Sequence, residues 1–599
     1  MSTGLHVDRA APGPWPLAFD CGRGRLAGWW RGGSGSPERL PVVLCAPLGW
    51  EAEATVRTFV CWAELLSTAG FPVLRFDYAG AGDSPGIDEE PGRVAAWIAS
   101  VHAAVDEARR ISGSDRVALA GIHLGATMAA VVASERPDIA ALVAWGPFTT
   151  GRAYVRQVRA YRLLNALPDD PRGPGASRDE EAAGYRLTRG TVEELERLDL
   201  RALARRPAPR VLLLSRDAES DEALGQAWTR LGSETTLGVG AGWQEMMQQP
   251  RKSVVPEAVL DESCRFLIEA AGERAVAERA PIDPSRLERC WSVPGSVVEE
   301  AVCLGDGGTM AGVLGKPAHG STDAPPTVLF LTTASHHRIG PNRLWVRLGR
   351  ALSALGLQTL RFDLTGVGDS LLLPGESPTH AYSRESVSEV REVMDAVERA
   401  TGARRFVLVG LCSGAYLTYH TAVDDPRVTG IVAVNPQTFR WKEGDSLDIR
   451  QRQTLKSMRY YRKALLRGDT WRKAIKGELH LREISEVLVA RGWRRLRERT
   501  SAGLRREESD VARNLRLLVQ RGTDVYFLFG ADDEGVDALG REAGPVLREL
   551  SRSPSFQVDI VEGPSHTFEQ LWAQELLTER VVGRVSRQLG LARQRSAAG

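Results

Sequence analysis

Short apolar runs alternate along the chain with longer segments in which apolar residues recur every three or four positions. The runs 41–45 (PVVLC) and 406–409 (FVLV) are apolar throughout, whereas 63–71 and 349–357 have helical spacing and contain a glycine near their end. A strand that is apolar on both faces is typical of a parallel sheet covered by helices on both sides. The pattern therefore predicts an α/β architecture with mostly parallel sheets.

The same order of segments occurs twice. The segments RFDYAGAGDS (75–84) and RFDLTGVGDS (361–370) are nearly identical, and each follows a predicted helix. A strand, a tight turn and a helix come next in both halves, at 116–133 and 404–422. Self-similarity at matched positions indicates a tandem duplication.

The repeat divides the chain into two domains. With 599 residues the chain is too long for one compact core. We predict a first domain over 10–271 and a second over 295–592. The segment between them, 272–294, is rich in alanine, proline and charged residues and lacks a strand pattern, so we predict a linker there.

Composition excludes several classes of function. The formal net charge of +1 gives no whole-chain reason to expect nucleic acid as a partner. Because the N-terminus lacks a signal-like pattern and no apolar stretch approaches the roughly 18 residues of a spanning helix, we expect a cytoplasmic protein without a membrane span. The seven cysteines are scattered without CxxC pairs, so we expect no metal site, and nothing indicates a cofactor.

The segment GLCSG (410–414) follows an apolar strand and precedes a predicted helix. In a nucleophile elbow, two glycines permit a tight strand-to-helix turn that exposes the central side chain above the sheet. The central residue here is Cys412, between Gly410 and Gly414. An isolated cysteine is usually a small buried hydrophobe, so the assignment depends on its partners.

This order of parts resembles the α/β-hydrolase superfamily, and most closely the serine aminopeptidase-like hydrolases associated with bacterial exosortase and exopolysaccharide gene clusters. The resemblance rests on the two DxxGxGDS loops (77–84 and 363–370), the two elbows, and SHHRIGPNR at 335–343. It implies two tandem α/β-hydrolase domains, each with a helical lid insertion.

In that superfamily the nucleophile precedes the acid, and the acid precedes the histidine. The strand at 524–530 ends before Asp532 and Asp533, and the strand at 556–561 is followed by His566. Spacing after Gly530 favours Asp533 as the acid, with Asp532 as the alternative. We therefore predict a catalytic triad of Cys412, His566 and Asp533.

An oxyanion hole needs two N–H donors near the nucleophile. We expect one from the backbone of Ser413 and the second from the loop after the first core strand, at Ala334 or Ser335. His336 and His337 follow in this loop, either as substrate contacts or as an ordinary polar pair.

The first domain lacks a serine or cysteine at its elbow and a histidine after it. Its elbow, GIHLGA at 121–126, carries His123 at the central position, and no further histidine occurs until His319. Asp217 or Asp221 could be a residual acid, and Arg251 or Trp243 stands where a catalytic histidine is expected. We interpret this domain as a catalytically silent copy; the alternative, His123 as a nucleophile or phosphoryl acceptor, lacks supporting residues.

The segment 440–521 is a basic insertion at the position of a lid. It holds 23 lysines and arginines against 11 aspartates and glutamates. This charge favours an anionic substrate, such as a carrier-bound acyl group, although a solvated helix face would have a similar composition. Its aromatic residues fit helix packing, and no nucleic-acid motif accompanies them.

The sequence thus predicts a hydrolase or acyltransferase that acts on an ester or thioester. A thioester formed on cysteine transfers its acyl group readily to acceptors other than water, so transfer competes with hydrolysis. The alternative is a non-catalytic binding or scaffold protein built from two degenerate hydrolase folds, because a fold does not guarantee a function.

Overall fold

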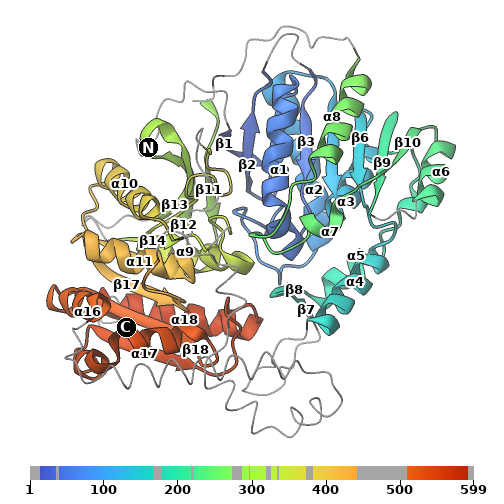
Figure 1. Ribbon diagram of the computed structural model, residues 1–599. Coiled ribbons are helices and arrows are strands. Elements are labelled where there is room, and N and C mark those ends of the chain that lie inside the picture. Colours follow the sequence, from blue (N-terminus) through green and yellow to red (C-terminus); the bar gives the residue numbers. More distant parts are fainter. Residues whose placement is uncertain are drawn as a thin grey trace, which may run out of the picture.

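The computed structural model of the protein describes residues 14–34, 39–165, 179–216, 221–272, 283, 286–295, 297–318, 326–333, 336–372, 382–441 and 509–590. Two large sheets lie in separate domains, the first in blue and green and the second in yellow to red (Figure 1). None of the described helices is both long enough and apolar enough to cross a membrane.

The sheet of the first domain has the strand order β1-β2-β4-β3-β5-β6-β9-β10. Strand β2 pairs antiparallel with β1 and β4, and all other neighbours are parallel. The strands are β1 (Trp15–Asp20), β2 (Arg25–Arg31), β3 (Val42–Cys45), β4 (Val73–Phe76), β5 (Val117–Ile122), β6 (Ile139–Trp145), β9 (Arg210–Ser215) and β10 (Glu234–Val239).

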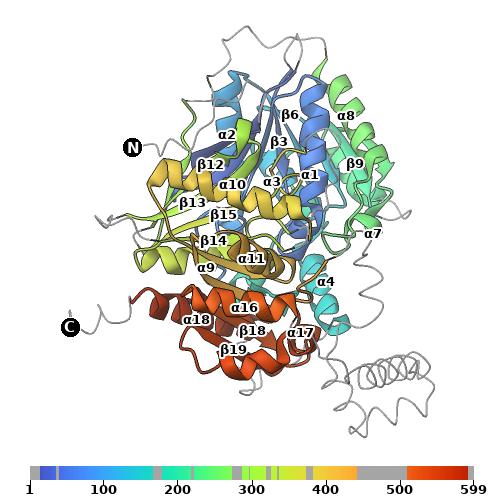
Figure 2. The ribbon, with the colours of Figure 1, turned by 60° about the vertical axis from the view of Figure 1, so that its left-hand side comes forward.

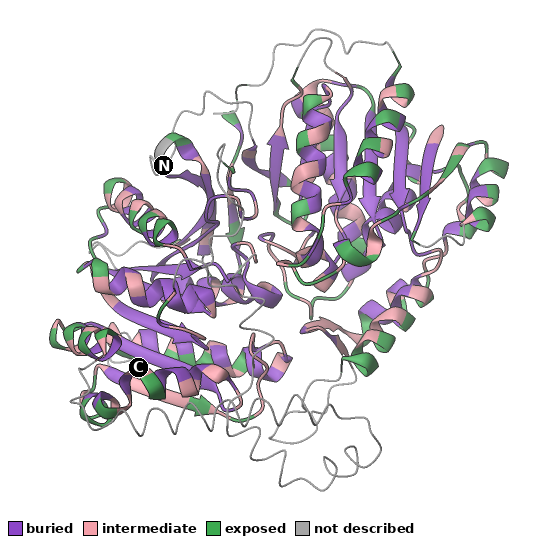
Figure 3. Cartoon of the chain, in the orientation of Figure 1, coloured by how far each residue is buried: buried purple, intermediate pink, exposed green. Residues whose placement is uncertain are grey.

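Helices cover both faces of this sheet. One face packs on α1 (Trp50–Thr68) and α8 (Glu257–Ala271), and the other on α2 (Arg93–Ser112) and α3 (Leu124–Glu135). Most strands are buried, whereas the edge strand β10 and the outer sides of the helices are exposed (Figure 3). The remaining elements are α4 (Gly151–Leu164), a hairpin of β7 (Glu180–Ala182) and β8 (Tyr185–Leu187), α5 (Arg189–Leu195), η1 (Leu200–Ala202), α6 (Glu222–Arg230) and α7 (Trp243–Met246).

The second sheet repeats this topology, with the order β11-β12-β13-β15-β14-β16-β17-β18-β19. Strands from β15 to β19 are parallel and the others antiparallel. The strands are β11 (Cys290–Val293), β12 (Val297–Leu304), β13 (Met310–Pro317), β14 (Thr327–Leu331), β15 (Gln358–Phe362), β16 (Phe406–Leu411), β17 (Val428–Val434), β18 (Asp524–Gly530) and β19 (Phe556–Val561). The short turns η3 (Asp306–Gly308) and η4 (Pro341–Arg343) occur in its loops.

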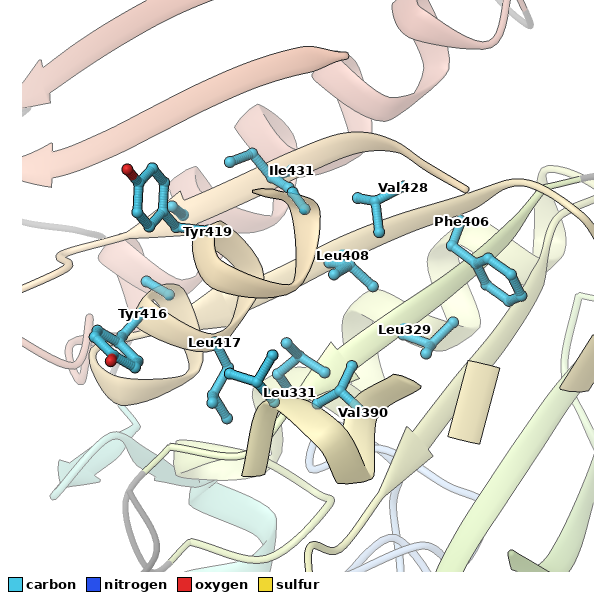
Figure 4. Close-up of a cluster of buried hydrophobic side chains, with 14 of the residues drawn as sticks. Leu329, Leu331, Val390, Phe406, Leu408, Tyr416, Leu417, Tyr419, Val428 and Ile431 are labelled. Atoms are coloured by element: carbon cyan, nitrogen blue, oxygen red, sulfur yellow. The ribbon is translucent and has the colours of Figure 1, made fainter. Parts of the chain in front are cut away.

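The second sheet is also covered on both faces. One face packs on α10 (Arg384–Thr401), α11 (Ser413–Asp424), α16 (Asp510–Gln520) and α17 (Glu534–Leu550), of which the first three lie side by side in Figure 2. The opposite face packs on α9 (Leu344–Ala354) and α18 (Leu571–Gln588). Leu408 and Ile431, from neighbouring strands, lie near Leu417 and Tyr419 of α11 in the core that supports the elbow (Figure 4).

Two predicted boundaries are wrong. The linker 272–294 extends too far, because β11 lies inside it and pairs with β12 of the second sheet. The lid 440–521 also extends too far, because α16 packs into the core through Val511, Leu515 and Leu518. Residues 442–508 of that insertion lie outside the described residues. In the first domain, α4, the β7–β8 hairpin and α5 occupy the corresponding place between β6 and β9.

The two repeated DxxGxGDS loops meet at the contact between the domains. Arg75 of the first repeat pairs with Asp369 of the second, and Arg361 of the second pairs with Asp83 of the first at 2.7 Å. These residues occupy the same two positions in each repeat. The domains therefore associate through reciprocal contacts, as the subunits of a two-fold symmetric dimer do.

Arg338 lies at the centre of this contact with 2% of its side chain exposed. Its guanidinium donates to Asp83 at 2.8 Å, to Asp363 at 2.6 Å and to Asp369 at 2.7 Å. Burial and the negative charge of Asp83 raise the pKa of the neighbouring Asp77 carboxyl to about 7. The contact between the domains is thus a buried ionic network in which each charge depends on its partners.

Candidate active site

Cys412 lies between β16 and α11, in the tight turn that the sequence predicts. Its φ is 57°, in the left-handed region that residues other than glycine rarely adopt. A Cβ atom at Gly410 would lie 2.3 Å from the backbone of Gly414, and one at Gly414 would lie 2.8 Å from the carbonyl oxygen of Leu331. The two glycines are therefore required by the close approach of strand and helix, which holds Cys412 at the edge of the sheet.

His566 and Asp533 come together at the same edge. His566 Nδ1 lies 2.5 Å from Asp533 Oδ2, and the other carboxylate oxygen accepts the N–H of Gly535 at 2.8 Å. Asp533 is the N-cap of α17 and is buried. The alternative acid, Asp532, has a buried Oδ1 atom with no hydrogen bond among the described residues. The geometry thus pairs His566 with Asp533.

The thiol of Cys412 and the imidazole of His566 influence each other. His566 Nε2 is buried and forms no hydrogen bond of ordinary geometry within the described residues, yet it is close enough to affect the thiol. Burial alone would raise the pKa of Cys412, but the charge and proximity of His566 lower it below its ordinary value. Burial would lower the pKa of His566, but Asp533 and then Cys412 raise it well above its ordinary value. Both shifts favour a thiolate beside an imidazolium.

Two further residues shape the site and were not anticipated from the sequence. The side chain of Asn435 donates to the carbonyl oxygen of His566 at 2.7 Å and accepts the N–H of Gly530 at 2.9 Å, so it connects the histidine loop to β18. The Tyr382 hydroxyl lies 3.7 Å from the Cys412 sulfur and also lowers the pKa of the thiol. Asn435 follows β17 where Gly146 follows β6, and this difference between the repeats was a usable signal.

Of the predicted oxyanion donors, only Ser413 is among the residues that the structure describes. Ser413 is the first residue of α11 and is buried. Ala334 and Ser335 lie outside the described residues. The preceding residue, Thr333, donates its hydroxyl to the carbonyl oxygen of Leu411 at 3.2 Å, which ties the start of this loop to the strand that ends at Cys412.

His336 is engaged on both ring nitrogens. Nδ1 lies 3.1 Å from the carbonyl oxygen of Thr333, and Nε2 lies 3.3 Å from the carboxylate of Glu53 in the first domain. Because a carbonyl and a carboxylate both accept, both nitrogens act as donors, as in an imidazolium. Of the two roles considered for His336, this arrangement favours the structural one. His337 instead lines a cavity between the domains.

Replacing Glu53 by glutamine should destabilise the protein by about 1–3 kcal/mol, because an imidazolium with only 20% of its side chain exposed then loses its carboxylate. Burial lowers the pKa of His336, but Glu53 raises it, and the net value is above normal. For Glu53, burial raises the pKa and His336 lowers it, and the net value is below normal. The stability from the raised histidine pKa is present at low pH and is lost as pH rises through that pKa. The effect of Glu53→Gln should therefore be larger near about pH 6 than near about pH 9.

Urea denaturation at the two pH values measures this difference. Glu64→Gln is the matched control, since Glu64 lies on the same helix and is exposed. An equal loss of stability at both pH values would show that the charge of His336 does not matter.

The elbow of the first domain has the same backbone shape but a different environment. His123 has a φ of 58° and is fully buried. Its Nδ1 lies 2.5 Å from Glu51 Oε2, and its Nε2 lies 3.1 Å from the Arg216 guanidinium. Gln157 bridges the two, donating to Glu51 and accepting from Arg216, each at 2.8 Å. Both imidazole nitrogens are thus occupied by protein groups.

The Arg216 side chain can contact His123 because Gly146, which it passes, has no side chain. A Cβ at Gly146 would lie 2.5 Å from Cγ of Arg216. The second domain has the opposite arrangement: the larger Asn435 stands at the position of Gly146, and Gly530, without a side chain, stands at the position of Arg216. Trp243, one of the residues expected in place of a catalytic histidine, packs on His123 with ring centroids 5.0 Å apart. Of the residual acids, Asp217 lies outside the described residues.

Comparison with known protein families agrees with the repeat. The family described as "Alpha/beta hydrolase family" matches residues 318–576, and the family described as "Serine aminopeptidase, S33" matches residues 52–171. Two α/β-hydrolase family models thus match the chain in tandem, one in each domain. The matched residues of the second domain include the whole Cys412, Asp533 and His566 arrangement, and those of the first include His123.

Several solved structures are similar to one half of the chain over most of their own length. Est1E from Butyrivibrio proteoclasticus, solved with ferulic acid bound, is 21% identical, covers 42% of this chain and 98% of its own, and has a TM-score of 0.33. Proline iminopeptidase from Mycobacterium smegmatis is 15% identical, with 43% and 98% covered and a TM-score of 0.29. The Pyrococcus furiosus esterase Pf2001 is 18% identical, with 42% and 90% covered and a TM-score of 0.29. No curated protein sequence matches the chain.

Proposed function

We propose that the second domain hydrolyses or transfers the acyl group of an ester or thioester, with Cys412 as nucleophile, His566 as general base and acid, and Asp533 as the group that orients His566. The contact between His566 Nδ1 and Asp533 Oδ2, beside a cysteine on a nucleophile elbow, carries this proposal. The first domain is proposed to be catalytically silent, because both nitrogens of His123 are engaged by Glu51 and Arg216.

The chemistry follows from the positions of the protons. His566 Nε2 holds the proton of the Cys412 thiol, and the thiolate attacks the carbonyl carbon of the substrate. The negative charge that develops on the carbonyl oxygen is met by the N–H of Ser413 at the start of α11. The bond to the leaving group then breaks, and His566 Nε2 gives its proton to the departing oxygen or sulfur.

The second half of the cycle releases the acyl group. Water or another acceptor gives a proton to His566 Nε2 and attacks the thioester on Cys412, and the sulfur leaves and regains a proton. Asp533 keeps a proton on Nδ1 throughout and stabilises the imidazolium. The excess of basic residues over 440–521 supports an anionic substrate, such as an acyl group on a phosphate-containing carrier.

The direct test is stoichiometric acylation of the full chain. With p-nitrophenyl acetate we expect a burst of p-nitrophenolate stoichiometric with protein, and with iodoacetamide we expect modification of Cys412 at pH values below the ordinary thiol pKa of about 8.5. The direction follows from the lowered pKa of Cys412, since the thiolate persists as pH falls toward that lower value.

Cys412→Ala should abolish both signals. Cys61→Ala is the control, because Cys61 is a partly buried thiol in the first domain whose pKa is raised, chiefly by burial. Modification of Cys412 only at alkaline pH, with no burst, would contradict the proposal and favour the binding or scaffold alternative.

A further inference from the structure

A cavity of about 820 Å³ lies between the two domains. Glu51 and Gln157, which hold His123, line it on one side, and the loop after β14, α9 and the start of α18 line it on the other. Cys412 and His566 are not among its lining residues. The cavity therefore adjoins the degenerate elbow of the first domain, and the second domain forms its opposite wall.

Three guanidiniums on the cavity wall, that of the buried Arg93 and those of the half-buried Arg343 and Arg347, have no carboxylate partner at hydrogen-bond distance among the described residues. Arg343 donates only to backbone carbonyl oxygens of the Gly-rich loop, those of Gly80, Gly82, Ser84 and Gly86. Arg347 donates to the backbone of Asn342 and to the side-chain amide of Gln574. Carbonyl and amide oxygens satisfy the N–H groups but leave the positive charges without a counter-ion.

Two nitrogen atoms of the Arg93 guanidinium have no hydrogen-bond acceptor among the described residues. Its side chain is 2% exposed and donates once, to the carbonyl oxygen of Ala79 at 2.8 Å. Nε and Nη1 have no hydrogen-bond partner in the described part of the chain, and the Glu90 carboxylate lies 3.6 Å from Nη1. The indole N–H of Trp97, also on the cavity wall, is likewise buried without an acceptor. Unused buried donors of this kind mark a place where a ligand can supply the acceptors.

The three arginines share one region. The Arg93 guanidinium packs against Gly80, whose carbonyl oxygen accepts from Arg343. Burial lowers the pKa of all three arginines, that of Arg343 to about 9, with the neighbouring Arg350 contributing. The acid among them, the half-buried Asp88, has a pKa that burial raises, so it offsets their charge poorly.

The other arginines on the cavity wall form ion pairs with carboxylates. Arg75 and Arg338 pair with Asp369, Arg186 with Glu89, and Arg350 with Glu299. Among the described residues Arg343 and Arg347 form no ion pair, and Arg93 forms one, with the exposed Glu90 at 3.6 Å. Around them the wall is largely apolar and aromatic, through Phe76, Ile87, Trp50, Trp97, Leu187 and Ile339.

We propose that this cavity is a second ligand site, separate from the Cys412 site, which binds an organic anion with a carboxylate or phosphate group on an apolar body. The anionic group accepts from Arg93 and Trp97 and offsets the charges of Arg343 and Arg347. The apolar body packs on the aromatic wall. The silent domain thus keeps a binding role beside an elbow that no longer carries a nucleophile.

Calorimetric titration of the full-chain Cys412→Ala variant tests the site without interference from catalysis. The titrants are decanoate, decyl phosphate and decan-1-ol, which share a chain and differ in the head group. We expect saturable binding of one or both anions with one site per chain, and binding of the alcohol at least about tenfold weaker. The two anions distinguish a carboxylate ligand from a phosphate ligand.

Arg93→Gln, added to Cys412→Ala, should weaken binding of the anion at least about tenfold. Arg186→Gln is the matched control, because Arg186 also lines the cavity but is paired with Glu89, and it should change affinity little. Circular dichroism and the unfolding midpoint establish that both variants are folded. The proposal is overturned if neither anion binds, if the alcohol binds as tightly as the anions, or if Arg93→Gln leaves the affinity unchanged. These outcomes are independent of whether Cys412 is a nucleophile.

Discussion

Replacing His566 by alanine should lower kcat/KM for an activated ester by about 10³–10⁴-fold. In the proposed mechanism His566 holds the thiol proton, and its charge keeps the pKa of Cys412 low, so its loss removes both. Without the imidazolium, burial dominates and the thiol pKa rises, so the pH at which iodoacetamide modifies Cys412 should move upward.

Asp533→Asn should act through the same histidine. An amide nitrogen can donate to Nδ1 and thereby place the imidazole proton on Nε2, which then cannot accept the thiol proton. We expect a loss of about 10³-fold with little change in KM. Asp532→Asn is the control, because Asp532 forms no contact with His566 among those the structure describes, and it should retain most activity.

Steady-state kinetics with p-nitrophenyl acetate and the pH dependence of thiol modification are measured together on the three variants. If His566→Ala modified Cys412 at the wild-type rate and pH, the thiol would not depend on the imidazole and the proposed triad would be wrong. Full activity of Asp533→Asn would instead place the orienting group elsewhere.

Replacing Arg338 by methionine should reduce the free energy of unfolding by about 3–5 kcal/mol. The guanidinium is the shared partner of Asp83, Asp363 and Asp369, and its removal leaves buried carboxylates facing one another across the two domains. Methionine can fill part of the volume but supplies no donor. The loss should be smaller at low pH, where the carboxylates can take up protons.

Urea denaturation followed by tryptophan fluorescence measures the change, and Trp29 lies under the Arg338 guanidinium at 4.9 Å. Arg189→Met is the matched control: its pair with Glu193 is exposed on both sides, so the variant should change stability by less than about 0.5 kcal/mol. A loss below about 1 kcal/mol for Arg338→Met would mean that the domains are held mainly by apolar contacts such as those of Trp291 and Val293.

The sequence by itself determined the α/β class, the duplication and the positions of both elbows. Each of these follows from the spacing of neighbouring residues: apolar runs of strand length, and glycines on either side of Cys412 and His123. The order of cysteine, acid and histidine was also readable, because the ends of parallel strands meet at one edge of a sheet. Spacing after Gly530 favoured Asp533 over Asp532, but which of the two faces His566 depends on how α17 begins.

Only the tertiary structure decided which residues distant in the sequence share a site. Glu53 and His336, and the three arginines around the cavity, have no local signature, because each residue is ordinary until its partner lies beside it. The change from Gly146 to Asn435 is visible when the repeats are compared, but the contact of Arg216 with His123 that it permits is not. The DxxGxGDS loops are the clearest case. Their repetition was visible in the sequence, but their role as the contact between the domains follows from a pseudo-symmetric association that brings Arg75 to Asp369 and Arg361 to Asp83. Burial of those charges, rather than any motif, determines how the two domains are joined.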